Sequence, residues 1–234
     1  MKSIQDILAD PVDVNKILRE RAERLQYAGV IGNILGQPFI LAGGAMRSDE
    51  PRDFDIFGCD KPIDLAETKR KCERDRRVCL LTHTDNAVTI ELYGQTVQLC
   101  KHFKGTPMAL IRSFDFSHVQ AGAVFTSLGV VGEVVFTGHF HDVEAYSYTP
   151  QYLGSEYPLS SLVRLVKFKE RGDFAGENED YFFGQLLSIL CDIVKRGFRD
   201  EDDFRDQCVA ISAALPNCDP ELLFQLLHKK GGES

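Results

Sequence analysis

Short apolar runs fill the first two thirds of the chain, and two of them predict the central strands of a sheet. The run Phe39–Ala42 is short and entirely apolar, which is typical of a buried strand. In Asp53–Phe57, acidic and apolar residues alternate. Because alternate side chains of a strand share a face, Asp53 and Asp55 should point the same way, while the apolar residues between them enter the core.

Further runs of β-branched and apolar residues predict the rest of the sheet. Gly94 and Gln95 separate two of these runs, so we expect a hairpin there. A second hairpin is expected around Gly129. The additional predicted strands are Val78–Leu81, Ala87–Leu92, Thr96–Cys100, Val119–Phe125 and Val130–Phe136.

Helical spacing of apolar residues appears at the beginning of the chain. Asp13–Leu35 predicts one amphipathic helix that leads into the first strand and breaks near Gly32 and Gly36. Its arginines are expected on a solvated face rather than on a binding surface: Arg19, Arg21 and Arg24.

A second predicted helix, Asp60–Arg77, is the most basic segment of the chain. Its cations form either an exposed helix face or a patch that guides a nucleotide or nucleic acid. A short helix is also expected at Met108–Ile111. The cations of the basic segment are Lys69, Arg70, Lys71, Arg74, Arg76 and Arg77.

The composition becomes helical from Pro158 onward, so we expect an α+β fold in which helices flank a mixed sheet and a helical carboxy-terminal part follows. We assign residues 1–150 to the sheet domain and residues 151–234 to a helical region packed on it. The helices expected in that region are Tyr181–Val194, Phe204–Leu215 and Pro220–Leu227.

Composition and charge narrow the functional classes. The 234 residues are 44% hydrophobic and 26% charged, as in an ordinary globular protein, and the net charge of −8 does not favour long-range attraction of a polyanion. We expect no membrane span, because no apolar run approaches ~18 residues, and no signal peptide. Seven cysteines without a Cys-x-x-Cys pair indicate reduced thiols that serve as packing residues, and therefore a cytoplasmic location.

His139 and His141, which flank Phe140, could be interpreted as metal ligands together with Asp142, because two histidines and an acid lie close together in the sequence. No further ligand follows at a recognisable spacing. We therefore expect a polar turn rather than a metal site.

The two acids of the central strand are candidate ligands of a divalent cation. Carboxylates side by side on a strand repel one another unless a cation lies between them, and Mg²⁺ prefers carboxylate and phosphate oxygens. Upstream, Gly43 and Gly44 can bring backbone N–H groups close to a phosphate, with the positive end of a helix behind them. The segment Pro38–Phe57 thus contains the parts of a nucleotide-transferring site.

The sequence Gly43-Gly44-Ala45-Met46-Arg47, followed by Asp53-Phe54-Asp55, resembles the motif of the DNA polymerase beta-like nucleotidyltransferases. It is most similar to the branch of CCA-adding enzymes and bacterial poly(A) polymerases, whose motif is Gly-Gly-x-x-Arg, a spacer and Asp-x-Asp. The spacer Ser48–Arg52 is shorter than usual there. The resemblance implies a nucleotidyltransferase sheet and Mg²⁺-dependent transfer of a nucleoside monophosphate from an NTP, with pyrophosphate leaving. The acceptor hydroxyl could belong to an RNA 3′ end, a small molecule or a protein.

Two later segments resemble the same family in part. The hairpin DNAVTIELYGQTVQLCKHF has the family's rhythm, but Gln98 stands where the family has an acid. The segment beginning SFDFSHV is similar to the family's RRDFTINA, with Phe114 at its second arginine and Val119 at its asparagine, beside Gln120. The resemblance makes Asp115 a candidate third acid, and a structural cap is the alternative.

The segment LVRLVKFKERGDF resembles the neck of the family, R-x-x-R-F-x-x-x-x-G-F. Arg164 and Lys167 stand at its basic positions, which in the family reach the triphosphate.

By this resemblance, Gly43 and Gly44 hold the β- and γ-phosphates through N–H groups, and Asp53 and Asp55 bind two Mg²⁺ ions. Asp115 assists the metal site or the sugar. The cations that offset phosphate charge are Arg47, Arg164 and Lys167. Two alternatives stay open: a non-catalytic nucleotide-binding or interaction module on a lapsed fold, and a kinase-like enzyme, for which the chain lacks a P-loop motif. The sequence does not indicate the oligomeric state.

Overall fold

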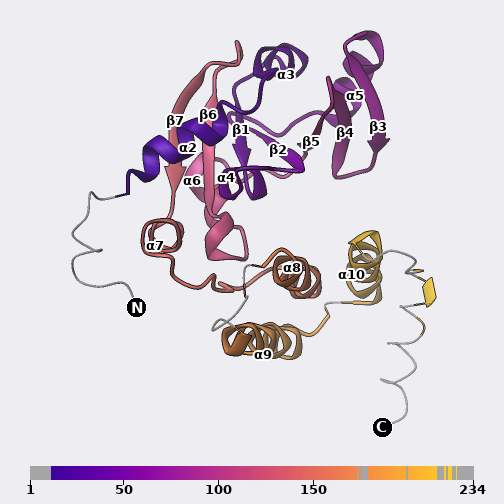
Figure 1. Cartoon of the computed structure of the whole chain (residues 1–234). Coiled ribbons are helices and arrows are strands. Elements are labelled where there is room, and N and C mark those ends of the chain that lie inside the picture. Colours follow the sequence, from indigo (N-terminus) through magenta and orange to yellow (C-terminus); the bar gives the residue numbers. More distant parts are fainter. Residues whose placement is uncertain are drawn as a thin grey trace. The chain divides into compact units, whose positions relative to one another are not determined.

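Seven strands form one mixed sheet in the order β3-β4-β5-β2-β1-β6-β7 (Figure 1). All neighbouring strands are antiparallel except β2 and β5, which are parallel. This computed structural model describes residues 12–172, 174, 179–198, 200–214, 219, 221, 222 and 225. The strands are β1 Phe39–Ala42, β2 Asp53–Gly58, β3 Val78–His83, β4 Ala87–Leu92, β5 Gln95–Cys100, β6 Ala121–Phe125 and β7 Val131–Phe136.

The predicted α+β class is confirmed, and most predicted strands agree with the observed ones to within two residues. The chain divides into two compact units, Met1–Tyr148, which contains the sheet, and Thr149–Ser234. That the second unit packs on the first remains a prediction.

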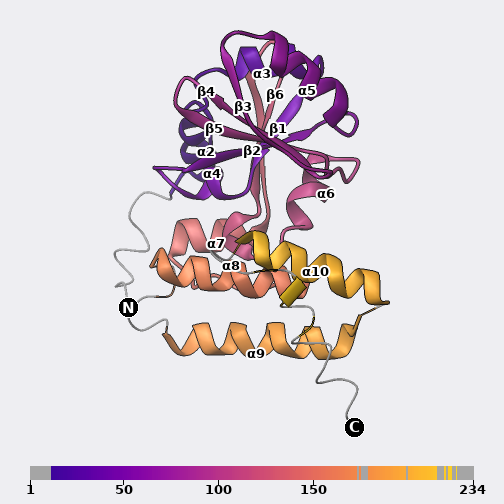
Figure 2. The ribbon, with the colours of Figure 1, turned by 90° about the vertical axis from the view of Figure 1, so that its right-hand side faces the viewer.

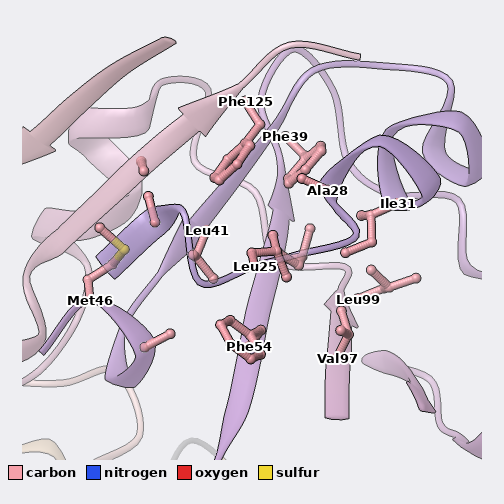
Figure 3. Close-up of a cluster of buried hydrophobic side chains, with 14 of the residues drawn as sticks. Leu25, Ala28, Ile31, Phe39, Leu41, Met46, Phe54, Val97, Leu99 and Phe125 are labelled. Carbon is pink, nitrogen blue, oxygen red and sulfur yellow. The ribbon is translucent and has the colours of Figure 1, made fainter. Parts of the chain in front are cut away.

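One face of the sheet carries the main core. Phe39 and Leu41 of β1 lie on this face with Phe54 of β2 (Figure 3). The Phe39 ring stacks on Phe125 of β6, with a centroid distance of 4.9 Å. Five helices contribute side chains to this core: α2 Val14–Ala22, α3 Ala28–Leu35, α4 Gly44–Arg47, α5 Leu65–Arg74 and α7 Gly138–Tyr146.

The opposite face has a smaller core. Here Ile40 of β1 and Phe57 of β2 pack with Leu110 of helix α6, Pro107–Arg112. The Thr106 hydroxyl accepts a hydrogen bond from the Ala109 N–H and so begins this helix. In Figure 2, α2 and α6 lie on opposite sides of the strands. Because alternate residues of β2 share a face, Asp53 and Asp55 belong to the α6 side, toward the amino-terminal end of the strand.

The predicted helix over Asp13–Leu35 is wrong in its continuity, since two helices, α2 and α3, occupy this range. Residues 23–27 separate them. The carboxyl end of α3 agrees with the prediction, because Gly36 adopts a left-handed conformation there, with φ of 64°. Gly32 does not break the helix. A Cβ at Gly32 would lie 2.2 Å from the Ser127 carbonyl oxygen, so glycine allows the β6–β7 turn to approach α3.

Two other helix predictions are corrected. The basic helix begins at Leu65 rather than at Asp60, because the Asp64 side chain accepts a hydrogen bond from the Glu67 N–H. The expected polar turn around His139 is instead helix α7, Gly138–Tyr146, whose first turn is capped by the Thr137 hydroxyl.

The second unit contains α8 Pro158–Glu170, α9 Glu179–Arg196 and α10 Glu201–Ala214, as the helical composition predicted. The Lys169 ammonium lies 4.3 Å from the centroid of the Phe182 ring, and Arg196 forms an ion pair with Asp203 at 3.1 Å. The predicted helix Pro220–Leu227 falls largely outside the described residues.

Within the described residues, no helix is both long and apolar enough to cross a lipid bilayer. The six cysteines described are all free thiols, and Cys218 lies outside the described residues. The cytoplasmic location stays a prediction.

Candidate active site

The diglycine forms a sharp turn between β1 and the short helix α4. Gly43 has φ of 76° and ψ of −134°, a conformation that side chains rarely adopt. Its N–H donates to the Ala121 carbonyl of β6 at 3.3 Å, so this group continues the sheet and is engaged within the fold. Gly44 is the first residue of α4, where helical N–H groups have no partner inside the helix, and open space surrounds its Cβ position. Of the two predicted phosphate donors, the Gly44 N–H is the better placed.

The carboxylate of Asp55 lies beside this turn. Ala42 and Asp55 are partners in the β1–β2 register, and a Cβ at Gly43 would lie 3.7 Å from the Asp55 Oδ2 atom. Asp53 is exposed and Asp55 is half-buried. The structure therefore brings the predicted pair of acids together with the diglycine turn at one end of β2.

The pair is electrostatically strained. Burial, and then the charge of Asp53, raise the pKa of Asp55 to about 7. Burial and the charges of Asp55 and Asp53 also raise the pKa of the Cys100 thiol, so this cysteine stays protonated and is a poor nucleophile. A cation at the pair would relieve the repulsion between the carboxylates and favour their charged forms.

The residues present fit a hard divalent cation with an incomplete protein shell. Mg²⁺ is commonly held by one or two carboxylates, with phosphate and water oxygens completing its coordination. Gln98 of β5 is the register partner of Asp55 and can supply a neutral oxygen at most. In the part of the chain that the structure describes, no group of three or more His, Cys, Asp or Glu side chains is placed to hold an ion.

The role of Asp115 as the third metal ligand stays a prediction. Asp115 is 5% exposed and lies between α6 and the 3₁₀ turn Ser117–Val119. This turn contacts both α4 and α7. Asp115 thus belongs to the same end of the unit as the diglycine turn.

Gln120 fixes the Asp115 segment, a role that the sequence did not reveal. Its Nε2 donates to the Phe114 carbonyl at 2.8 Å, and its Oε1 accepts from the Thr137 hydroxyl at 2.9 Å. The side chain is buried, so both bonds are shielded from water. The signal in the sequence was an amide directly beside the family's asparagine position, which Val119 occupies.

Arg21 corrects the prediction of a solvated arginine face. It is 7% exposed, donates to the Met46 carbonyl at 2.9 Å, and pairs with both oxygens of Glu144 at 2.8 and 2.9 Å. Burial alone would lower the pKa of Arg21, but its bonds to Glu144 and Asp49 raise it above the usual value. This guanidinium connects α2 to the end of α4, to the turn before β2 and to α7.

The other predicted cations lie in different places. Arg47 is in the last turn of α4 and is half-buried. Arg164 and Lys167 are on α8 in the second unit, where Arg164 donates to the Ser161 hydroxyl at 3.4 Å. Their approach to a triphosphate at Asp53 and Asp55 remains a prediction.

The basic helix α5 lines a surface pocket of about 420 Å³ on the main-core side of the sheet. Several of its charges are used locally: Lys71 donates to the Ile34 carbonyl at 2.9 Å and lies 3.1 Å from Glu67. Both interpretations of the basic segment therefore stay open. The pocket residues are Asn33, Ile34, Lys71, Arg74, Asp75 and Arg76.

Comparison with solved structures identifies the fold. A CCA-adding enzyme with CTP aligns with a TM-score of 0.53 and 17% identity, over 93% of this chain and 53% of that one. A tRNA-processing enzyme with CTP aligns with a TM-score of 0.50 and 15% identity, over 87% and 55%. The chain thus spans about half the length of these proteins. No protein-family model and no curated protein match the chain. The resemblance to CCA-adding nucleotidyltransferases is confirmed for the fold.

Proposed function

We propose that the protein is an NTP-dependent nucleotidyltransferase that moves a nucleoside monophosphate to an acceptor hydroxyl, with an RNA 3′ end as the preferred candidate acceptor. The observation that carries this proposal is the pair Asp53 and Asp55 beside the diglycine turn, with the pKa of Asp55 raised to about 7. A nucleotide-binding fold shared with a CCA-adding enzyme supports it. A hydroxyl group of a small molecule or of a protein is the alternative acceptor for the same site.

In the proposed reaction, the acceptor hydroxyl oxygen forms a bond to the α-phosphorus and its proton passes to water. The bond between the α-phosphorus and the oxygen that bridges to the β-phosphate breaks, and pyrophosphate leaves. Asp53 and Asp55 would hold two Mg²⁺ ions, which supply charge neutralisation and activate the hydroxyl. The Gly44 N–H at the start of α4 would donate to a phosphate oxygen. Little covalent chemistry is required of the protein, because positioning and charge lower the barrier.

Cations of the chain would balance the charge that moves to pyrophosphate as it leaves. Arg47 stands next to the turn on α4, and Arg164 and Lys167 are the candidates from α8. Asp115 would orient the sugar or the acceptor through its segment, which Gln120 fixes. This assignment gives each predicted site residue a role that a single substitution can test.

A second candidate is a non-catalytic nucleotide-binding module. The observation that favours it is Gln98, a neutral residue in register with Asp55 where the family has an acid. Such a module would bind an NTP without transferring the nucleotide. Thermal stabilisation by an NTP would then occur without label transfer.

The test uses the full chain with Mg²⁺, a short RNA and each of the four α-labelled NTPs in turn. We expect label in the RNA from at least one NTP. The transfer rate should fall by about 100-fold or more in Asp53→Asn and Asp55→Asn, because electrostatic stabilisation at the site lowers the barrier. Asp85→Asn, an exposed acid in the β3–β4 turn, is the matched control and should keep full activity. Undiminished transfer in both site variants would remove the pair from the mechanism.

A further inference from the structure

Four aromatic rings follow one another at the end of the first unit. Phe136 ends β7, His141 and Tyr146 lie on α7, and Tyr148 follows the helix. The His141 ring stacks on Phe136 with centroids 6.2 Å apart and planes 19° apart. Tyr146 meets His141 edge-on at 5.7 Å, and Tyr148 lies 5.8 Å from Tyr146. We call Phe136, His141, Tyr146 and Tyr148 the aromatic row.

The outer half of the aromatic row is open to solvent. Tyr146 is 50% exposed and Tyr148 is 60% exposed, whereas Phe140 of the same helix is 1% exposed and fills the core. The backbone presents the two tyrosines together, because Ser147 adopts a left-handed conformation and the Tyr148 N–H donates to the Asp142 carbonyl at 3.4 Å. Packing in the core therefore accounts for Phe140, but it does not account for the two tyrosines.

The aromatic row begins at the same end of the sheet as the diglycine turn, but on the other face from the acid pair, because Phe136 packs against the main core. Phe136 is the register partner of Ala121, whose carbonyl accepts the Gly43 N–H. β7 is separated from β1 by one strand, so Phe136 lies about 10 Å from the diglycine turn, two strand spacings away. Arg21 also bonds both to Glu144 of α7 and to the Met46 carbonyl of α4. Row and diglycine turn thus share one end of the sheet.

The exposed rings of the aromatic row indicate which kind of ligand it could bind. Exposed rings without charge offer π-faces, and unpaired nucleobases stack on such faces whatever their sequence. A protein of net charge −8 gains little from long-range attraction of RNA, so stacking is a suitable source of affinity. We propose that the aromatic row binds the unpaired bases of single-stranded RNA next to the 3′ end that receives the nucleotide. This inference rests on the proposed function, because it identifies the acceptor as a single strand.

The experiment measures fluorescence anisotropy of a labelled, unstructured RNA of about ten nucleotides with the full chain, in EDTA and without NTP. We expect Tyr146→Ala and Tyr148→Ala each to weaken binding by about 5-fold to 100-fold, the range found for loss of one stacked base. Tyr146→Phe and Tyr148→Phe should bind within about twofold of the wild type, because the ring faces are kept. Circular dichroism melting confirms that each variant is folded.

Tyr93→Ala is the matched control, since Tyr93 is 59% exposed and stacks on Tyr27 in a different part of the unit. It should bind RNA as the wild type does. A duplex of the same sequence should bind more weakly, and the affinity should fall only gently with salt, since few phosphates are contacted.

Wild-type affinity in both alanine variants would overturn the proposal, as would the absence of single-strand binding in the wild type or equal losses in the alanine and phenylalanine variants. These outcomes are separate from those of the transfer assay. If the protein transfers a nucleotide to RNA but the alanine variants of the row bind RNA like the wild type, only the proposal that the aromatic row binds RNA would be refuted. Binding that depends on the row, without transfer from any NTP, would refute only the enzymatic proposal.

Discussion

The two faces of strand β2 have opposite effects on the free energy of folding: one buries apolar side chains, and the other holds two carboxylates that repel one another. On the main-core face, Phe54 is 4% exposed and Ile56 is 0% exposed. On the opposite face, Asp53 and Asp55 lie close enough that repulsion adds to burial in raising the pKa of Asp55. The same alternation that buries the apolar side chains brings the acids together.

This difference explains why the carboxylates stay in an unfavourable arrangement. A strand whose other face is packed into a core cannot rotate or shift without exposing that core, and a shift by one residue would exchange the two faces. The burial of Phe54 and Ile56 therefore stabilises the geometry that the acids alone would avoid. Strain of this kind is typical of functional sites.

The largest stability effect is expected on the core face. Ile56→Ala should lower the free energy of unfolding by about 2–5 kcal/mol, because it removes buried methyl groups and leaves a cavity. Urea denaturation measures this, with Ile56→Val as the smaller control change. Asp53→Asn on the opposite face should cost little by comparison, because Asp53 is exposed. Equal losses in Ile56→Ala and Asp53→Asn would contradict the assignment of the two faces.

The next effect concerns pH on the site face. The pKa of Asp55 is about 7 in the folded chain, above its ordinary value of 3.8, so the folded state binds more protons between these values. Stability in EDTA should therefore fall as pH rises from about 4 through about 7, by about 2–4 kcal/mol in all. Asp55→Asn should remove this loss and be more stable than the wild type at pH 8 but not at pH 4. Parallel pH profiles for the two proteins, measured by urea denaturation, would speak against a strained carboxylate.

A smaller effect is expected at the diglycine turn. Gly43→Ala should cost about 1–3 kcal/mol, since alanine must adopt the positive φ of this position. Gly44→Ala is the matched control, because Gly44 is helical and open space surrounds its Cβ position. It should be neutral or slightly stabilising in thermal melts. Similar melting temperatures for the two variants would show that the turn tolerates a side chain.

The smallest effect tests Gln98. Gln98→Glu places a third carboxylate in register with Asp55 and should cost about 1 kcal/mol in EDTA through like-charge repulsion. Mg²⁺ should then raise the melting temperature of Gln98→Glu more than that of the wild type. Thr89→Glu, on the neighbouring strand β4 opposite Gln98, serves as the more distant control. An equal rise of the melting temperature with Mg²⁺ in all three proteins would show that position 98 is not part of a cation site.

Local pattern was enough for much of the fold and for the centre of the candidate site. The strands β1, β2 and β4 and the pair Asp53 and Asp55 follow from apolar runs and from the two-residue period, which depend only on neighbouring residues. The break between α2 and α3 did not follow, because the helical spacing of apolar residues continues across residues 23–27. The helix α7 was mistaken for a turn, although Thr137 provides a helix cap.

Residues that act over long distances were the hardest to predict. Arg21 looks like other surface arginines in the sequence, yet its partners Met46 and Glu144 lie 25 and 123 positions away. Gln120 similarly bonds to Thr137, 17 positions along the chain. No local pattern identifies such partners, because burial of a polar side chain becomes favourable only when the folded chain provides its hydrogen bonds.

The amino-acid sequence by itself determined the strands and most of the helices, where the paired acids and the diglycine lie, and that the acids share a face, because periodicity and turn chemistry are local properties. Only the tertiary structure decided that Asp55 lies against Gly43 and opposite Gln98, and that Arg21 is buried. These features depend on strand order and register. Both are set by the packing of the whole core and not by any one segment.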